Sequence, residues 1–269
     1  MDSPLVSVII PCYNASKYVE QAVRSVMEQT YQNLEIICCD DCSTDNTLEI
    51  LEKLALEDSR ITVVKNDSNL KIVKTLNKLI GLATGKYIAR MDGDDVCSPE
   101  RFAKELAVLE SEPEIAIVST DMAYFDESGT WGKISHPTYP HGIDFLYETP
   151  FCHAPCMVRK EAYDTVQGYS VDKKLLRVED YHLWMKMYKA GYKGKNIGEI
   201  LYSMRDDRNA YNRRKFKYRL NSAYVICLTI KELKLPIWGY ARALRPIIVG
   251  LLPNFLYDKL HKWNLRGKK

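Results

Sequence analysis

An acidic run at the end of an apolar segment is the feature of this sequence that points most directly to chemistry. Asp92, Asp94 and Asp95 lie within four residues, after the strand-like stretch 86–91. Carboxylates this close repel one another and resist burial, so they are suited to offering oxygen ligands to a hard divalent cation. Mg²⁺ or Mn²⁺ held in this way usually has a phosphate as its other partner. The alternative is a solvated acidic turn.

A second acidic pair weighs against the solvated turn. Asp40 and Asp41 follow the apolar segment 34–39 and precede a turn and the helical pattern of residues 46–57. In an open α/β sheet, ligands bind outside the carboxyl ends of the strands, so two acidic strand ends are expected to share one crevice. Asp40 is also compatible with simply capping the turn that follows it.

The elements that position these residues alternate between strands and helices, which predicts an α/β fold with a mainly parallel central sheet flanked by helices. Apolar periodicity predicts strands at 5–11, 34–39, 61–64, 86–91 and 115–118, and helices near 19–27 and at 46–57, 70–83 and 99–111. Ser98 is the expected N-cap of the last of these helices, with Pro99 at its first position.

The second half of the chain has a different rhythm. Residues 126–148 are rich in Gly, His, Pro and Tyr and are expected to form a loop with little regular structure over the mouth of the site. A strand is predicted at 151–159 and a helix at 179–190, ended by Gly191. Beyond residue 205 the pattern is helical and basic, with an apolar stripe at Phe216, Leu220, Ala223, Cys227 and Ile230.

Composition is that of an ordinary globular protein, with 46% hydrophobic and 27% charged residues among 269. The charge is divided unevenly. Residues 208–269 hold 15 Lys and Arg against two acids, a net charge of +13, whereas the preceding residues hold 23 against 33, a net charge of −10. No nucleic-acid-binding motif accompanies the basic segment, so a nucleic-acid partner is not expected.

Cysteine usage and the start of the chain predict a cytoplasmic protein. The N-terminus enters a strand pattern without a basic or cleavable apolar segment. Eight cysteines agree with this if they are reduced. Cys39 and Cys42 form a C-x-x-C pair, but Cys152 and Cys156 have the wrong spacing to complete a four-thiolate zinc site.

Four ordered motifs give the chain a specific resemblance to family 2 glycosyltransferases of the GT-A fold. The resemblance covers roughly residues 4–205 and depends on the segments 8–14 (VIIPCYN), 40–47 (DDCSTDNT), 87–95 (YIARMDGDD) and 179–184 (EDYHLW). Segments 149–153 and 205–207, with 213–216, are similar to bacterial exopolysaccharide-cluster glycosyltransferases.

The resemblance implies a nucleotide-sugar site at the first two strand ends. Pro11 and Tyr13 would lie beside the base, and Asp41 would accept a hydrogen bond from a uracil N–H or its equivalent. A plain turn with a packing aromatic is the alternative for the first two. Lys71 and Lys74 stand where relatives often place Gly and Arg, and either contacts the diphosphate or belongs to a solvated helix face.

The same resemblance assigns roles to the acidic run. Asp94 would bind Mn²⁺ or Mg²⁺ directly, and Asp92 would contact the ribose or a metal-bound water, so both enter the predicted metal site. Gly93, between them, joins the nucleotide-sugar-binding set. Asp95 has two open interpretations, ligation and a hydrogen bond to the adjoining turn.

On the acceptor side, the resemblance makes Asp180 the general base that takes the proton of the acceptor hydroxyl, and one displacement then inverts the anomeric carbon. Glu179 would lie on the same side, although two acids at a helix start also suit the helix dipole. His153 either lines the acceptor pocket or is a buried structural histidine, and Arg205 either reaches the diphosphate or lies on the surface.

These residues predict a metal-dependent inverting glycosyltransferase that moves a sugar from a nucleotide-sugar, with UDP favoured, to a glycan or polyprenyl-linked oligosaccharide acceptor in exopolysaccharide or cell-surface synthesis. The alternative is a non-catalytic GT-A-fold protein that binds nucleotide-sugars or partners. Residues 1–207 would form the catalytic domain, with donor binding at about 1–125 and the acceptor side at about 126–207.

Residues 208–269 would form a basic amphipathic helical appendage. We expect it to dock peripherally on the cytoplasmic face of the inner membrane, because its charge lies beside apolar stripes. The run 246–253 is too short to span a bilayer. The alternative is that these helices pack on the catalytic domain or on a second subunit in a homodimer.

Overall fold

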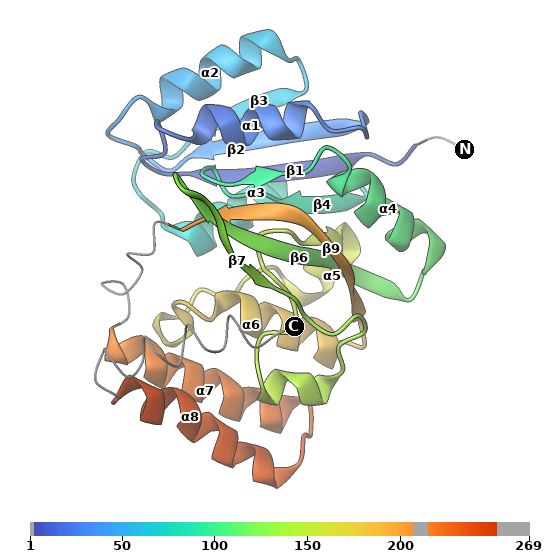
Figure 1. Ribbon diagram of the computed structural model, residues 1–269, viewed down its shortest axis with the longest axis vertical. Coiled ribbons are helices and arrows are strands. Elements are labelled where there is room, and N and C mark those ends of the chain that lie inside the picture. The colour runs from blue at the N-terminus through green and yellow to red at the C-terminus, as the bar shows by residue number, and fades with distance from the viewer. Residues whose placement is uncertain (1–2, 207–214, 252–269) are drawn as a thin grey trace.

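One curved sheet organises the molecule (Figure 1). The structure, a computed structural model, describes residues 3–206 and 215–251. Within these ranges the strands follow the order β3-β2-β1-β4-β8-β6-β9-β5, and β7 pairs with β6. Their bounds are β1 Val6–Cys12, β2 Leu34–Asp40, β3 Ile61–Lys65, β4 Tyr87–Arg90, β5 Val96–Cys97, β6 Ile115–Asp126, β7 Gly129–Ile134, β8 Met157–Arg159 and β9 Lys193–Arg205.

The parallel half of the sheet brings three strand ends to one edge. β1 lies between β2 and β4, parallel to both, and the register pairs Cys12 with Asp40 and Ile9 with Arg90. The residues that follow β2 and β4, including Asp41 and Asp92, therefore emerge on the same side as the end of β1. This is the arrangement that the acidic strand ends predict.

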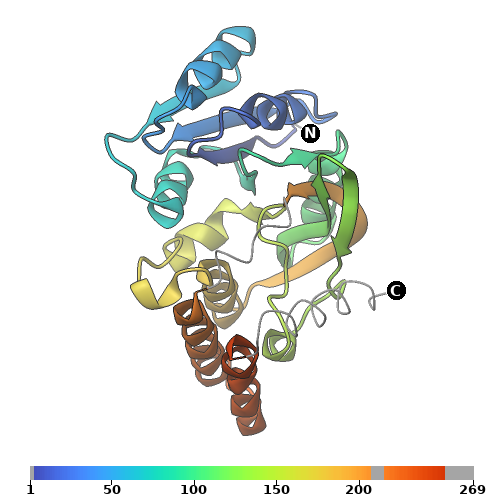
Figure 2. The same ribbon diagram turned by 60° about the vertical axis from the view of Figure 1, so that its left-hand side comes forward.

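Helices cover both faces of the sheet because its strands are apolar on both sides. On β1, Val8 and Ile10 face the layer of α1, α2 and α4, whereas Ile9 faces the layer of α3, α5 and α6. Figure 2 shows the same elements turned by 60°. The bounds are α1 Val19–Met27, α2 Thr47–Glu57, α3 Ile72–Leu82, α4 Arg101–Ser111, α5 Lys160–Val166, α6 Glu179–Lys189, α7 Phe216–Glu232 and α8 Tyr240–Gly250. The expected α/β class is confirmed.

The prediction of a loop at 126–148 is wrong for part of that segment. β7 occupies Gly129–Ile134 and forms a hairpin with β6, with Tyr124 and Trp131 stacked at a ring-centroid distance of 5.2 Å. A short 3-10 helix, η1, follows at Gly142–Leu146. β7 is largely exposed or half-exposed, so it carries no apolar alternation that a sequence pattern could detect.

Other boundaries also differ from the prediction. The strand expected at 151–159 is limited to β8, and α5 follows it directly. β9 was not predicted at all. Ser98 is not the N-cap of α4: the helix begins at Arg101, and Ser98 accepts the amide of Arg101 through its backbone carbonyl.

The C-terminal helices lie at the end of the molecule opposite β1, β2 and β3 (Figure 1). α7 packs against α6 and a short 3-10 helix, η2, at Lys173–Leu175, and α8 packs against α7. The predicted stripe on α7 is divided, because Ala223 and Ile230 are buried whereas Phe216 and Leu220 are exposed. None of the helices in the described ranges is long and apolar enough to cross a membrane.

Candidate active site

A cavity of about 220 Å³ opens where β1 and β2 end. It brings together four of the residues that sequence reasoning assigned to the donor site. The lining residues are Pro11, Cys12, Tyr13, Asp41, Asn69, Lys71, Ile72 and Thr75. Tyr13 is half exposed at the rim, so its ring offers a flat surface to a bound planar group.

Asp41 organises one wall of this cavity. Its carboxylate is buried, and Oδ1 accepts hydrogen bonds from the Asn66 side chain and the Leu70 amide, both at 2.8 Å. Oδ2 accepts the Lys71 amide at 2.9 Å. Because an ionised carboxylate has about four acceptor positions, one position on Oδ2 remains for a ligand donor. Asp40 accepts the Ser43 amide at 3.2 Å, which is the turn-capping role expected for it.

Lys71 has an unusual backbone conformation, with φ 69° and ψ 161°. This region is populated almost only by glycine and costs roughly 1–3 kcal/mol for a residue with a side chain. In this conformation the Lys71 amide donates a hydrogen bond to Asp41. The Nζ atom of the side chain lies 5.9 Å from the centre of the Tyr13 ring. The chain therefore keeps a charged side chain at the cavity despite backbone strain.

The acidic run forms a loop whose members have different environments. Asp92 is half-buried, and its Oδ1 accepts from the Arg90 guanidinium at 2.5 Å. Asp94 is exposed, and its carbonyl accepts from Arg205 Nε at 3.1 Å. A Cβ on Gly93 would lie 3.0 Å from Cys12 Sγ, so a larger residue would push this loop away from β1.

Asp95 points away from the others into the protein. It is buried, and it accepts from the Tyr202 hydroxyl and the Arg205 amide, both at 2.7 Å. Burial, with repulsion from Asp92 and Asp94, raises the pKa of Asp95 well above its usual range. This geometry gives Asp95 the structural role of anchoring the loop.

The carboxylates of Asp92 and Asp94 offer hard oxygen ligands of the kind Mn²⁺ and Mg²⁺ prefer. In the part of the chain that the structure describes, no group of three or more His, Cys, Asp or Glu side chains could hold a metal ion alone. The donor set therefore fits a cation that takes its remaining ligands from a phosphate-bearing substrate and water.

Arg90 links this loop to the acceptor side, and sequence reasoning did not single it out. It is buried at the end of β4, and besides bonding Asp92 its charge lowers the pKa values of both His153 and Asp180. Burial and Glu179 outweigh this effect at Asp180 and raise its pKa to about 6. Arg90 is therefore bonded to Asp92 and also exerts its charge on Asp180.

Two other predicted residues have defined partners. His153 Nε2 lies 2.6 Å from the Tyr169 hydroxyl, and burial lowers its pKa well below the usual value, which keeps the ring neutral. Arg205 stacks between Tyr18 and Phe125, at 3.9 and 4.4 Å from the ring centres. Glu179 begins α6 and is half-buried.

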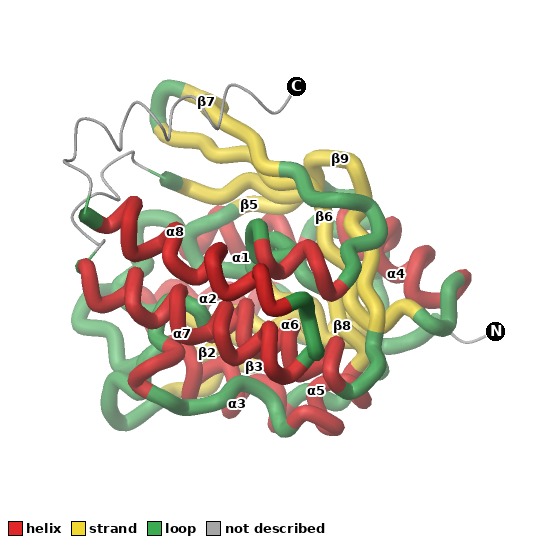
Figure 3. Tube along the Cα trace, turned by 90° about the horizontal axis from the view of Figure 1, so that it is seen from below, coloured by secondary structure: helices red, strands yellow, loops and turns green. Residues whose placement is uncertain are grey.

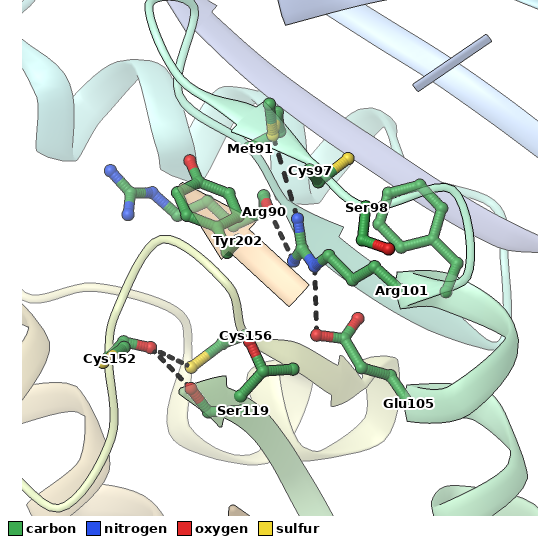
Figure 4. Close-up of polar contacts among 12 residues, drawn as sticks. Arg90, Met91, Cys97, Ser98, Arg101, Glu105, Ser119, Cys152, Cys156 and Tyr202 are labelled. Atoms are coloured by element: carbon green, nitrogen blue, oxygen red, sulfur yellow. Dashed lines mark hydrogen bonds and ion pairs between the residues drawn. The ribbon is translucent and has the colours of Figure 1, made fainter. Parts of the chain in front are cut away.

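A buried ion pair on α4 contacts the residues that lead into the acidic loop (Figure 4). Arg101 and Glu105 are fully buried on α4 and bond at 3.0 Å. Arg101 also donates to the Arg90 carbonyl at 2.9 Å, and its guanidinium lies 5.1 Å from the Tyr202 ring centre. Tyr202 in turn accepts the Asp92 amide at 3.1 Å. The i,i+4 spacing of Arg101 and Glu105 was readable in the sequence, but nothing there indicated burial.

Comparisons with known proteins identify the family of this chain. Residues 7–167 match the family described as Glycosyl transferase family 2. A Bacillus subtilis (strain 168) protein assigned as the glycosyltransferase EpsE is 37% identical over 99% of this chain and 96% of its own length. The Escherichia coli UDP-Glc:alpha-D-GlcNAc-diphosphoundecaprenol beta-1,3-glucosyltransferase WfaP is 30% identical over 82% of this chain and 85% of its own.

Solved structures share the fold at low sequence identity. Staphylococcus aureus TarS 1-349 in complex with UDP-GlcNAc superposes with a TM-score of 0.69 at 19% identity, covering 98% of this chain and 76% of the TarS 1-349 chain. The mannosyltransferase PcManGT from Pyrobaculum calidifontis, in complex with GDP-Man and Mn²⁺, has a TM-score of 0.67 at 19% identity, covering 97% of this chain and 80% of that one.

We predict that Lys71→Gly raises the free energy of unfolding by about 1 kcal/mol. Relief of roughly 1–3 kcal/mol of backbone strain exceeds the roughly 0.4–1 kcal/mol of added chain entropy. Urea unfolding measures the change. Lys74→Gly is the matched control: Lys74 lies within α3, where the same substitution should lower stability by about 1 kcal/mol. A loss at both positions would contradict strain at Lys71.

We also predict non-additive effects at the buried ion pair. Arg101→Met should lower the free energy of unfolding by about 3–5 kcal/mol, because it leaves Glu105 buried without its partner. The double variant Arg101→Met/Glu105→Leu should regain most of that loss, since both charges are gone. Urea unfolding of the two single variants and the double variant completes the cycle, and additive losses would refute the coupling.

Proposed function

The chain belongs to glycosyltransferase family 2, and from that premise we propose that it transfers a sugar from a UDP-sugar to an acceptor hydroxyl, with inversion at the anomeric carbon. The observation that carries this proposal is Arg90, which bonds to Asp92 and whose charge acts on Asp180. The carboxylate proposed to hold the metal and the carboxylate proposed as the base thus share the influence of one buried cation. A non-catalytic binding protein, the second candidate, would not require this arrangement.

The cavity at the end of β1 is the proposed site of the base of the nucleotide. The free acceptor position on Asp41 Oδ2 suits an imide N–H of uracil, and the Tyr13 ring suits stacking on its face. TarS binds UDP-GlcNAc and WfaP uses UDP-Glc by their names, which supports a UDP-sugar over other donors. Lys71, at the same cavity, would contact the diphosphate.

Asp94 and Asp92 would hold Mn²⁺ or Mg²⁺ against the donor diphosphate. Bound there, the cation would neutralise negative charge on the departing nucleoside diphosphate. PcManGT, a neighbour of the same fold, was solved with Mn²⁺ and GDP-Man, which supports a divalent cation at this position. Gly93 lets the loop approach β1 closely enough to share one substrate with the cavity.

Asp180 would act as the general base. Its carboxylate takes the proton of the acceptor hydroxyl while that oxygen forms a bond to the anomeric carbon, and the bond from this carbon to the diphosphate oxygen breaks with its electron pair. A pKa of about 6 leaves the carboxylate ionised at neutral pH yet more basic than an ordinary aspartate. Glu179 and the neutral His153 would line the acceptor side.

The acceptor is proposed to be a glycan or a polyprenyl-linked oligosaccharide of an exopolysaccharide or cell-surface pathway. WfaP acts on a diphosphoundecaprenol-linked sugar by its name, and this chain covers 85% of its length. The division into a catalytic domain at 1–207 and a helical appendage at 208–269 is part of the same proposal. A homodimer is compatible with it and is not required.

Asp94→Asn should abolish metal-dependent binding of UDP, because it removes a charged ligand while hardly changing the size of the side chain. Calorimetry with UDP and Mn²⁺, with and without chelator, measures this. Glu114→Gln, an exposed acid outside the proposed site, is the control and should bind as the parent does. Parental affinity in Asp94→Asn would refute the metal assignment.

Asp180→Asn should keep UDP affinity near the parental value and lower transfer by roughly 10²–10⁴-fold. Parental transfer should rise with pH through about 6, as the carboxylate ionises. Folding raises the pKa of Asp180, so its contribution to the free energy of unfolding is greatest below about pH 4 and is lost as the pH rises from about 4 to 6. The Asn variant, which carries no such charge, should be at least as stable as the parent at pH 7.

A release assay for UDP across pH 5–8 and urea unfolding measure these effects. Asp164→Asn, the same substitution at an exposed i,i+4 pair with Lys160, is the control and should retain transfer. Retained transfer in Asp180→Asn would exclude the base role, and lost UDP binding would indicate a structural one.

A further inference from the structure

The outward side of α8 and the turn before it form an apolar surface. Its members are large side chains, each exposed, that recur at helical spacing. We call this set the α8 face: Ile237, Trp238, Tyr240, Leu244, Ile248 and Leu251. Leu251 is 71% exposed and Ile248 58%, so this is more than the edge of a packed helix. Figure 3 shows α8 beside α7 on the underside of the molecule.

The opposite side of α8 is fixed to the protein through small residues. Gly239 lies so close to Leu146 and Ile230 that a Cβ atom at this position would force their side chains to move. Ala243 is buried. At the other end, Gly250 lies against Phe216 and Arg219. The helix is therefore held in one orientation, and that orientation keeps the α8 face outward.

The segment that carries this surface is strongly basic. Residues 215–251 contain seven Lys and Arg and one acid, Glu232, whose carboxylate is paired with Lys189. The cations are Lys215, Lys217, Arg219, Lys231, Lys234, Arg242 and Arg245. Exposed apolar side chains with Trp and Tyr among them, in a segment rich in Lys and Arg, suit the boundary between anionic headgroups and acyl chains.

We propose that the α8 face docks on an anionic bilayer, with α8 lying in the plane of the interface. The helix has 11 residues, which is about half the length needed to cross a bilayer. A second copy of the chain fits less well, because a twofold interface would place this basic surface against itself. Membrane docking would bring the acceptor side to a lipid-linked substrate and so deepens the proposed function. It rests on that function only for its biological role, because binding to a bilayer can be measured without sugar transfer.

The two C-terminal helices have different roles in this proposal. On α7, Ala223, Val225 and Ile230 are buried against the protein, so α7 serves to connect α8 to the catalytic part. In Figure 1, α7 and α8 lie at one end of the molecule and the β1–β3 region lies at the other. A bilayer in contact with α8 would thus leave the donor cavity open to solvent.

Flotation of the full chain with liposomes tests the proposal. The parent should bind phosphatidylglycerol-containing vesicles at low salt, bind less at high salt, and bind neutral phosphatidylcholine vesicles weakly. The double variant Leu244→Glu/Ile248→Glu should bind anionic vesicles at least about tenfold more weakly, because two apolar side chains lose their burial. Leu56→Glu on α2, where Leu56 is 89% exposed, is the matched control and should bind like the parent.

Two outcomes would overturn the proposal. One is failure of the parent to bind anionic vesicles at low salt; the other is equal binding by the parent and the double variant. Sedimentation that shows a dimer in the parent and a monomer in the double variant, without vesicle binding, would assign the face to a second copy. Calorimetry with UDP on the same samples separates the two proposals, because vesicle binding without UDP binding would contradict the proposed function alone.

Discussion

Mutual repulsion among the carboxylates after β4 is the constraint on which the rest of the site depends. Each is stabilised by a different group: Asp92 by Arg90, and Asp95 by Tyr202 and the Arg205 amide. Arg101 holds the Arg90 carbonyl and lies against the Tyr202 ring, so the buried pair on α4 supports both partners. The acidic loop is thus positioned by the neighbouring Arg90 together with groups from α4 and β9, which are more distant in the sequence.

The first half of the fold could be predicted because each of its elements carries its own signal. β1 and β2 are continuous apolar runs, and α1 buries Val19, Ala22, Val23 and Val26 at helical spacing. β9 and β7 carry no such signal. β9 alternates short buried and exposed stretches because it pairs with β6 across register shifts and meets β5 only near its end. Its conformation is set by these tertiary pairings, which a local pattern does not contain.

Site residues could be predicted where they belong to a sequence motif. They could not be predicted where their role depends on contacts between segments that are distant in the sequence. Asp41, Asp92, Asp94 and Asp180 stand at strand or helix ends in motifs, so their types and spacing are visible in the sequence. Arg90 is a single residue at the end of an apolar strand, and its effect on Asp180 depends on tertiary packing that the local sequence does not contain. Arg101 and Glu105 have the spacing of an ordinary surface pair, and only the packing of α4 on the sheet makes them a buried support.

Several features of the candidate site oppose stability. Lys71 holds a backbone conformation suited to glycine, Asp180 is a carboxylate with its pKa raised by burial, and the Nε of Arg90 is buried without a hydrogen-bond partner in the described part of the chain. Each would be removed by a simple substitution if stability alone decided the sequence. All three belong to the residues that we propose bind or position the substrates, which gives a functional reason for keeping them. The two apolar layers on either side of the sheet supply the stability that allows the fold to tolerate them.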